Sequence, residues 1–317
     1  MDTFLQVEHL KKYFKTHGGI LHAVDDVSFS IEEGKTIGVV GESGCGKSTL
    51  GRVMIHLLDS TDGKIIYKGE DVTKPDRKRL SRLRSEMQMI FQDPYSSLNP
   101  KYTVFQALEE PILIQQKLKA KEREEKVYEI MEMVGLAGRL VNTFPHELDG
   151  GRRQRIGIGR ALSINPKFIV CDEPVSALDV SIQAQILNLL QEIQEKMNLT
   201  YMFITHDLAV VKYISDKILV MYLGQVVEFA DSEELFSNPL NPYTKALLNA
   251  VPVPDIDHKN ERVILKGEVA SPIDPKPGCR FVSRCAYATE ACSSQDPELR
   301  EVSDGHWVRC INVQSIN

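Results

Sequence analysis

Nine consecutive residues, from Gly41 to Thr49, have the types and spacing of a phosphate-binding loop. They follow an apolar run that predicts a strand and precede a pattern that predicts a helix. Glycines let successive backbone N–H groups curve around a phosphate, and a helix N-terminus adds partial positive charge. Lys47 is expected to bridge the β- and γ-phosphates, Ser48 to hold Mg²⁺ and Thr49 to reach the α-phosphate. The predicted nucleotide-binding loop comprises Gly41, Glu42, Ser43, Gly44, Cys45, Gly46, Lys47, Ser48 and Thr49.

Two acids, Asp172 and Glu173, directly follow the apolar run 168–171. An acid at the C-terminal end of a buried strand, beside a loop of this kind, commonly completes a Mg²⁺ shell, and we predict this role for Asp172. Glu173 is then placed to orient or deprotonate the attacking water. Phosphoryl transfer depends mainly on such positioning and on charge neutralisation. The pair is a weak signal by itself and a strong one beside the loop at 41–49.

A parallel sheet is expected to position these residues. The runs 168–171 and 201–204 are apolar throughout, which is typical of strands buried on both faces. Between them, apolar residues recur at helical spacing over 182–197, behind Ser181 as the predicted N-cap. Strand, helix and strand in this order predict a doubly wound α/β core. The sequence also predicts antiparallel strands around 5–7 and 27–31, strands at 37–40, 217–222 and 225–229, a hairpin at 63–73, and helices at 77–87 and 117–133.

Composition narrows the class of protein. The chain has 317 residues, 42% of them hydrophobic, and a formal net charge of −6, which argues against nucleic acid as the main partner. The basic run 152–155 is interpreted as a solvated helix face. No apolar stretch approaches the length of a membrane span, and the first residues lack a secretory signal pattern, so we expect a cytosolic location.

Further motifs occur in a fixed order around the loop and the acid pair. Gln92 follows the apolar run 89–91, a Gly-Gly motif precedes Asp172 by about twenty residues, and His206 follows the strand 201–205. This ordered set resembles the ATP-binding cassette (ABC) family over residues 4–245. The residues that carry the resemblance beyond the loop are Gln92, Leu148, Asp149, Gly150, Gly151, Arg152, Asp172, Glu173, Ser176, Ala177, Leu178, Asp179 and His206.

The resemblance implies a fold with three parts. The core is a P-loop ABC ATPase, with a mixed sheet that combines a RecA-like parallel core and an antiparallel β-subdomain. A helical subdomain at about 95–160 carries the signature motif. The implied domains are an ABC nucleotide-binding domain at 1–245 and a small Cys-containing C-terminal extension at 246–317.

The resemblance also implies a mechanism. Two ATPase subunits dimerise head to tail, and Gly150 and Gly151 of one chain face the γ-phosphate held by the other. Gln92 senses Mg²⁺ and the membrane subunit, His206 contacts the γ-phosphate, and Asp179 couples the two sites. ATP binding closes the dimer and hydrolysis reopens it. An aromatic side chain stacks on adenine; the choice is Phe14, with Tyr13 next and Val24 lining the ring.

Two positions depart from the family pattern. The family usually has Ser where this chain has Asp149, and Gln where it has Arg152. A carboxylate at position 149 would face the like charge of the γ-phosphate unless it is protonated or turned away. The sequence therefore suggests an asymmetric heterodimer, in which the site that uses this signature is impaired.

Longer strings resemble the oligopeptide/dipeptide (peptide/nickel) importer ATPases, of the second-ATPase type. They are the segments 91–100 and 172–185 and, in the extension, 241–244, 271–273 and 278–285. The implied activity is ATP hydrolysis that energises uptake of peptides or similar solutes. The implied partners are a second ATPase, two membrane permeases and an extracytoplasmic solute-binding protein, with the chain peripheral at the cytoplasmic face of the membrane. Alternatives are a nickel or oligosaccharide importer, or a non-transport ABC ATPase acting in translation or DNA maintenance.

Four cysteines lie in the tail, at Cys279, Cys285, Cys292 and Cys310. Their spacing matches neither a zinc pair nor a ferredoxin motif. Reduced thiols, zinc and an iron–sulfur cluster all remain open on spacing alone. Because some members of the resembling family bind a [4Fe–4S] cluster through such a quartet, the resemblance favours a cluster with a structural role.

Overall fold

A computed structural model describes residues 3–250 and 271–316 of the chain. Part of the proline-rich start of the extension, with Pro252 and Pro254, lies outside the described residues. Contacts divide the chain into two compact units. Unit 1 comprises Met1–Ile31, Thr36–Lys74 and Ile204–Asn317, and unit 2 comprises Glu32–Lys35 and Pro75–Phe203. The predicted domain boundary at residue 245 stays a prediction.

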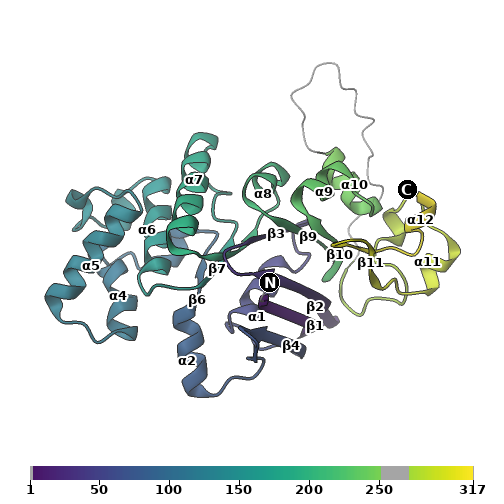
Figure 1. Ribbon diagram of the computed structural model, residues 1–317, viewed down its shortest axis with the longest axis horizontal. Helices are drawn as coiled ribbons and strands as arrows, with labels where there is room; N and C mark the ends of the chain where they lie inside the picture. The colour runs from purple at the N-terminus through teal and green to yellow at the C-terminus, as the bar shows by residue number, and fades with distance from the viewer. Residues whose placement is uncertain (1–2, 251–270, 317) are drawn as a thin grey trace. The chain divides into compact units, whose positions relative to one another are not determined.

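An antiparallel sheet in unit 1 begins at the N-terminus. It contains β1 (Thr3–Thr16), β2 (Gly19–Glu32), β4 (Asp62–Tyr67) and β5 (Glu70–Asp71), in the order β2-β1-β4-β5 (Figure 1). Leu5 lies opposite Tyr67 and Val7 opposite Ile65, so buried side chains share one face. These alternating apolar positions produced the sequence signal for half-buried strands.

The second sheet of unit 1 carries the phosphate-binding loop. Its strands are β3 (Thr36–Val40), β9 (Lys217–Tyr222), β10 (Gln225–Asp231), β12 (His306–Arg309) and β11 (Leu299–Ser303), in the order β11-β12-β10-β9-β3. β3 pairs with β9 in parallel, and every residue of β3 is buried. The helices of unit 1 are α1 (Lys47–Met54), α8 (Leu208–Ile214), α9 (Ser232–Ser237), α10 (Pro242–Asn249), α11 (Glu290–Ser294) and α12 (Val313–Ile316), with a 3₁₀ turn at Val282–Arg284.

The C-terminal extension contains the hairpin β11–β12. This hairpin extends the sheet, because β12 pairs antiparallel with β10 through Glu228 opposite Val308 and Phe229 opposite Trp307. The C-terminal residues are therefore continuous with the sheet that carries the loop.

Unit 2 combines three strands with a helical region. Its strand order is β8 (Thr200–Ile204), β7 (Phe168–Asp172), β6 (Met87–Ile90), and β6 pairs with β7 in parallel. The helices α4, α5 and α6 pack on one another (Figure 1). The helices of unit 2 are α2 (Arg77–Glu86), α3 (Pro94–Ser97), α4 (Val104–Gln115), α5 (Ala120–Met133), α6 (Gly150–Leu162) and α7 (Val180–Met197), with 3₁₀ turns at Gly138–Leu140 and Pro145–Glu147.

One local prediction was wrong. Ser181 was expected to cap α7, but the N-cap is Asp179, whose Oδ1 accepts a hydrogen bond from the Ile182 N–H at 3.0 Å. The Ser181 hydroxyl supports the cap by donating to the same oxygen at 2.7 Å. A carboxylate outcompetes a hydroxyl here because it accepts several hydrogen bonds and favours the positive helix end.

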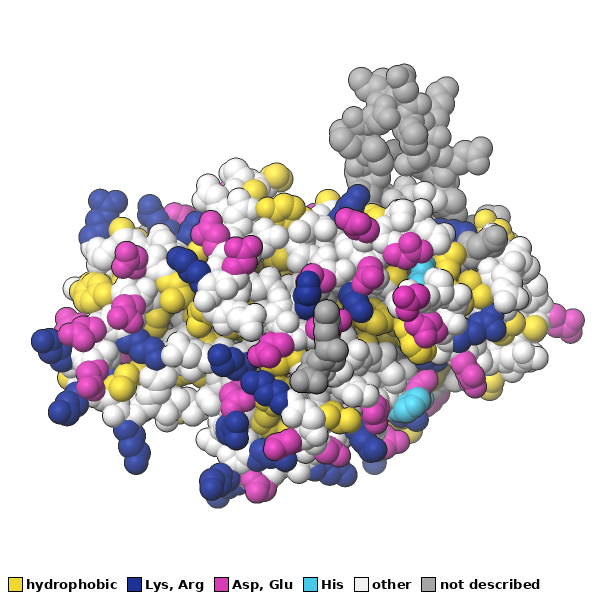
Figure 2. All heavy atoms as spheres, viewed as in Figure 1, with side chains coloured by type: hydrophobic (Ala, Val, Ile, Leu, Met, Phe, Trp, Pro, Cys, Tyr) yellow, Lys and Arg dark blue, Asp and Glu magenta, His cyan; other side chains and the backbone are white. Residues whose placement is uncertain are grey.

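Positive and negative side chains are mixed on the face shown in Figure 2, where Lys and Arg lie among Asp and Glu. None of the helices within 3–250 and 271–316 is long and apolar enough to cross a membrane.

Candidate nucleotide-binding site

The loop at 41–49 joins β3 to α1, as the sequence predicts. Two of its glycines are required by crowding as well as by backbone conformation. Gly41 has φ 149°, and a Cβ there would lie 2.2 Å from the Met221 carbonyl oxygen; Gly46 has φ 105°, and a Cβ would lie 1.9 Å from the Ala23 carbonyl oxygen. Neither position accepts another residue without a shift of backbone.

Helix α1 starts at Lys47, directly after Gly46, which provides no side-chain cap. The first hydrogen bond of the turn runs from the Leu50 N–H to the Gly46 carbonyl at 2.9 Å. A helix leaves its first N–H groups without intrahelical acceptors, and here these groups belong to Lys47, Ser48 and Thr49. This helix end suits an anionic phosphate.

The Lys47 ammonium is buried and folded back on the loop. Its Nζ donates to the carbonyl oxygens of Gly41 at 2.8 Å and Glu42 at 3.0 Å. The thiol of Cys45 lies 3.8 Å away, and burial raises the pKa of that thiol, which is consistent with a packing role. Lys47 is thus held by exchangeable bonds to neutral carbonyls, which a phosphate could replace.

The acid pair lies at the end of β7 in unit 2. Asp172 is buried, with 2% of its surface exposed. Glu173 adopts φ 48°, a left-handed conformation that is costly for a residue with a side chain and is concentrated at functional sites. Gln92, which follows β6, donates from Nε2 to Glu173 Oε2 at 2.9 Å. Two residues 81 positions apart, both predicted from the sequence, are therefore in direct contact.

The segment Ser176–Asp179 is tied to Glu173 and to α7. The Ser176 hydroxyl donates to the Glu173 carbonyl at 3.1 Å. Gln183 Nε2 donates to the carbonyls of Val175 and Leu178, both at 3.0 Å. Movement of Glu173 is consequently coupled to this segment within unit 2. Gln183 occurs in the family-like string 172–185, but sequence reasoning gave it no role.

The signature motif begins α6. Asp149 is the N-cap, and its Oδ1 accepts from the Arg152 N–H at 2.8 Å. A Cβ at Gly150 would lie 3.2 Å from Leu178 Cδ2, so the motif packs on the segment Ser176–Asp179 of the same chain. Leu148 is buried, whereas Asp149 and Arg152 are exposed.

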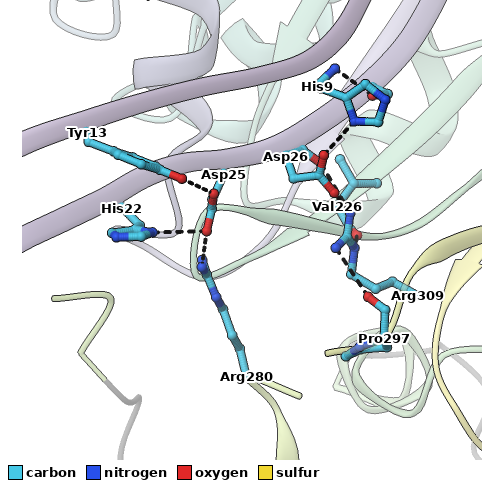
Figure 3. A network of polar contacts seen from close by, with 10 residues as sticks. His9, Tyr13, His22, Asp25, Asp26, Val226, Arg280, Pro297 and Arg309 are labelled. Atoms are coloured by element: carbon cyan, nitrogen blue, oxygen red, sulfur yellow. Dashed lines mark hydrogen bonds and ion pairs between the residues drawn. The ribbon is translucent and has the colours of Figure 1, made fainter. Parts of the chain in front are cut away.

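The predicted adenine-side residues lie on the β-subdomain strands of unit 1. Tyr13 stacks on His22 with ring centroids 4.0 Å apart, and its hydroxyl donates to Asp25 (Figure 3). Phe14 is half-buried beneath the Lys12 ammonium, 5.0 Å from its ring centroid, and Val24 is fully buried. His206 is exposed between β8 and α8.

Each unit thus brings together its own share of the predicted site. Unit 1 contains the phosphate-binding loop, the adenine-side residues and His206; unit 2 contains Gln92, Asp172, Glu173, the signature and the segment Ser176–Asp179. The individual roles of these residues stay predictions.

Two residues that contact the loop were missed as site residues. Tyr243 Oη accepts a hydrogen bond from the Glu42 N–H at 2.9 Å, and Arg284 forms an ion pair with the Glu42 carboxylate at 2.7 Å. Both occur in family-like strings of the tail, but their partner is more than 200 positions away in the sequence. No local pattern could have identified the contact.

The predicted iron–sulfur cluster at Cys279, Cys285, Cys292 and Cys310 is contradicted. All four are free cysteines that line one cavity, but among the described residues no group of three or more His, Cys, Asp or Glu side chains could hold a metal ion. The Cys292 sulfur lies 3.3 Å from Thr289 Oγ1 and accepts from Asn312 Nδ2 at 3.4 Å. Burial raises the pKa of the Cys279 thiol to about 11.

Two family models match the chain. The model described as "ABC transporter" matches residues 24–176, and the model described as "Oligopeptide/dipeptide transporter, C-terminal region" matches residues 227–292. The first match includes the phosphate-binding loop and the acid pair, and the second includes most of strand β10 and three of the four tail cysteines. Both resemblances inferred from motifs are confirmed.

Solved structures confirm the fold class. The ATP-binding cassette MJ0796, in a dimeric post-hydrolysis state bound to ADP and phosphate, is 28% identical with a TM-score of 0.66, covering 72% of this chain and 98% of its own. CbiO1 from Clostridium perfringens, part of an ABC transporter complex, is 28% identical with a TM-score of 0.67, covering 75% of this chain and 92% of its own.

Curated relatives match almost from end to end. The oligopeptide transport ATP-binding protein AppF of Bacillus subtilis is 49% identical, covering 98% of this chain and 97% of AppF. The dipeptide transport ATP-binding protein DppF of Haemophilus influenzae is 47% identical, covering 96% of this chain and 95% of DppF. The predicted heterodimer of two different ATPases finds no support in these comparisons. The chain belongs to the ABC transporter family, in its oligopeptide and dipeptide branch, as an ATP-binding subunit that hydrolyses ATP.

Proposed function

We propose that this chain energises the import of oligopeptides, dipeptides or similar solutes through partner permeases. The observation that carries this proposal is the identity of 47–49%, over at least 95% of both chains, to proteins named for oligopeptide and dipeptide transport. The likeness includes the C-terminal extension, which the model described as "Oligopeptide/dipeptide transporter, C-terminal region" matches in part.

The loop of unit 1 binds the triphosphate in this proposal. Lys47 exchanges its two carbonyl acceptors for the β- and γ-phosphate oxygens, and the start of α1 supplies N–H donors and partial positive charge. Thr49 reaches the α-phosphate. The adenine ring stacks on Phe14 or Tyr13.

The chain also offers a donor set that suits Mg²⁺. The hydroxyl of Ser48, the carboxylate of Asp172 and the amide oxygen of Gln92 are the hard oxygen ligands that this ion prefers. Gln92 uses its Nε2 to donate to Glu173, which leaves its oxygen available as a ligand. When bound, Mg²⁺ would offset the negative charge of the phosphates.

Glu173 is the proposed base that orients and deprotonates the attacking water. Its backbone is left-handed, and Gln92 holds one carboxylate oxygen. His206 is the proposed contact to the γ-phosphate, at the start of the turn into α8.

The signature and the segment Ser176–Asp179 are proposed to face a second ATPase cassette. Gly150 and Gly151 begin α6 and present a helix N-terminus, which suits the γ-phosphate bound by that cassette. Leu178 packs on Gly150 in the same chain, so a change at either motif reaches the other. The assembled complex includes membrane permeases and a solute-binding protein, with this chain peripheral at the cytoplasmic face.

Reconstitution tests the proposal directly. The chain, its cognate permeases and its solute-binding protein in vesicles should show ATP-dependent uptake of a radiolabelled oligopeptide, and Lys47→Ala should abolish it. Screening which ligand thermally stabilises the solute-binding protein identifies the cargo. Stabilisation by nickel or an oligosaccharide and not by peptides would refute the peptide cargo. An ATPase rate unaffected by permeases and substrate would favour a non-transport ATPase.

A further inference from the structure

Glu42, the second residue of the phosphate-binding loop, forms an ion pair with Arg284 of the C-terminal extension. Arg284 Nη1 lies 2.7 Å from Glu42 Oε2, and Arg284 Nη2 lies 2.9 Å from Glu42 Oε1. The arginine side chain is 7% exposed and the glutamate side chain 24% exposed. A paired, bidentate contact that is mostly removed from water is stronger and more directional than a surface ion pair.

The backbone of Glu42 is held as well. Its N–H donates to Tyr243 Oη at 2.9 Å, and its carbonyl accepts from Lys47 Nζ at 3.0 Å. The side chain, N–H and carbonyl of this one residue therefore connect the extension, α10 and the lysine that contacts phosphate. Because Lys47 Nζ donates to the Glu42 carbonyl, a displacement of Glu42 would also displace the Lys47 ammonium.

A cluster of buried aromatic rings fixes the groups that hold Glu42. Tyr222, Tyr243 and Phe281 pack with ring centroids 4.7 to 5.4 Å apart. The Arg284 guanidinium lies 5.9 Å from the Tyr222 centroid. Because Phe281 belongs to the extension and Tyr222 to β9, this cluster joins the extension to the sheet beside the loop.

A second arginine of the same segment reaches the other side of the loop. Arg280 forms an ion pair with Asp25, which also accepts hydrogen bonds from Tyr13 and His22 (Figure 3). Arg280 Nη1 donates to the Leu223 carbonyl, next to Gly224, whose N–H donates to the Cys45 carbonyl at 2.8 Å. The segment 280–284 is therefore connected to the loop through two independent routes.

The ion pair between Arg284 and Glu42 changes the charge of the phosphate-binding loop. A carboxylate within a phosphate-binding loop would repel the triphosphate, and the repulsion is strong where water is scarce. Arg284 neutralises Glu42 and holds its carboxylate in one place. The extension thereby removes an unfavourable charge from the loop and restricts its motion.

We propose that Arg284 is a positioning residue of the ATP site, which acts through Glu42 to fix the phosphate-binding loop and Lys47, with Arg280 as a second anchor. This inference rests on the proposed binding of ATP at residues 41–49. It assigns the C-terminal extension a part in ATP affinity, in addition to any part in assembly.

The test measures binding of Mg·ATP to the full-length chain by titration calorimetry, and the KM for ATP and kcat of the reconstituted transporter. Arg284→Gln should weaken ATP binding about tenfold, because an unpaired carboxylate then remains in the loop. The KM should rise in parallel, while kcat at saturating ATP changes less than about twofold. Arg284→Lys, which keeps the charge but loses the bidentate geometry, should give an intermediate affinity.

A control and double variants distinguish this inference from its alternatives. Arg300→Gln is the matched control, since Arg300 is an exposed arginine of the same extension whose Nη2 donates to the carbonyls of Cys310 and Ile311 at 3.4 and 3.5 Å. Adding Glu42→Gln to Arg284→Gln should cause no further loss of affinity, because both act on one contact. An unchanged affinity in Arg284→Gln, or an additive loss in the double variant, overturns the inference.

If Arg284→Gln does not fold, the double variant with Glu42→Gln and Arg284→Lys replaces it. Any loss of ATP affinity beyond that of Arg284→Lys alone then overturns the inference. Failure of ATP to bind the wild-type chain, or of Lys47→Ala to weaken it, refutes the ATP site itself.

Discussion

The carboxylate of Asp149 accepts a hydrogen bond from the backbone N–H of Arg152 at 2.8 Å, and Arg152 Nε lies 3.4 Å from its other oxygen. These residues are the two positions that the sequence analysis interpreted as departures from the family pattern. Both side chains are about half exposed, so the ion pair adds little stability. It does direct the carboxylate towards its own helix and partly balances its charge. The two departures are physically related.

Replacing Asp149 separates its capping role from its charge. Asp149→Ser should change the free energy of unfolding by less than about 0.5 kcal/mol, because serine is also a good N-cap, whereas Asp149→Ala should lower it by about 1 kcal/mol. The ATPase rate of the assembled transporter should rise in Asp149→Ser, since a like charge is removed from the face proposed to meet the γ-phosphate of a second cassette. Urea unfolding and phosphate release provide the two measurements.

Asp76 offers a matched control for this prediction. It caps α2 in the same way, accepting from the Arg79 N–H at 2.7 Å, and it belongs to no predicted site. Asp76→Ser should leave both stability and ATPase rate near the wild-type values. An ATPase rate that is the same in Asp149→Ser as in the wild type would show that the carboxylate is not an obstacle.

Glu173→Gln should retain ATP and lose hydrolysis. The amide has the same shape and can still pair with Gln92, but it cannot accept a proton from water. A positioned general base contributes about 10²- to 10⁴-fold to rate, so single-turnover hydrolysis should slow by at least about 100-fold. Equilibrium binding of ATP should stay within about twofold. Glu195→Gln, on the exposed side of α7, is the control. Brisk turnover in Glu173→Gln would remove the residue from its assigned role.

Sequence patterns were reliable where one short segment carries the signal. The apolar runs 168–171 and 201–204 became β7 and β8 because strands buried on both faces need no alternation. The hairpin β11–β12 was missed because β11 is largely exposed and shows no apolar periodicity. The cap of α7 was misassigned because Asp179 was considered only as a coupling residue.

Contacts between residues far apart in the chain could not be predicted from local sequence patterns. The pair Gln92–Glu173 could be expected only from the family resemblance, and the pair Glu42–Arg284 joins residues 242 positions apart. For the four tail cysteines, the sequence predicted a site that the structure does not support. The resemblance suggested a metal cluster, whereas the thiols of Cys279 and Cys292 are buried or hydrogen-bonded without forming a ligand set.

His306 should make stability depend on pH. It is fully buried between Glu228, at 2.8 Å, and Glu234, at 3.3 Å. Burial by itself lowers the pKa of His306, but the hydrogen bonds and charges of the two glutamates outweigh it and raise the pKa. A raised folded-state pKa stabilises the protein fully below the unfolded value of about 6.5, and this contribution is lost as pH rises through the folded value.

The measurement is the thermal midpoint from pH 5.5 to 9 for the wild type and for His306→Gln. The wild type should lose more stability than the variant as pH rises above about 6.5, because only the wild type gives up a proton there. His17→Gln, at an exposed histidine outside any strand pair, should reproduce the wild-type profile. Parallel profiles for the wild type and His306→Gln would show that His306 does not titrate in this range.

The last prediction compares two glycines of the phosphate-binding loop. Both have positive φ, 78° at Gly44 and 105° at Gly46, so alanine strains the backbone at either position by about 1–2 kcal/mol. A Cβ at Gly44 meets nothing within 4 Å, whereas a Cβ at Gly46 would lie 1.9 Å from the Ala23 carbonyl oxygen. Gly46→Ala must therefore also displace the start of α1, and it should reduce ATP affinity at least about tenfold more than Gly44→Ala does. Calorimetric titration of both variants checks the order, and equal losses would show that backbone strain, not the contact with Ala23, determines the shape of the loop.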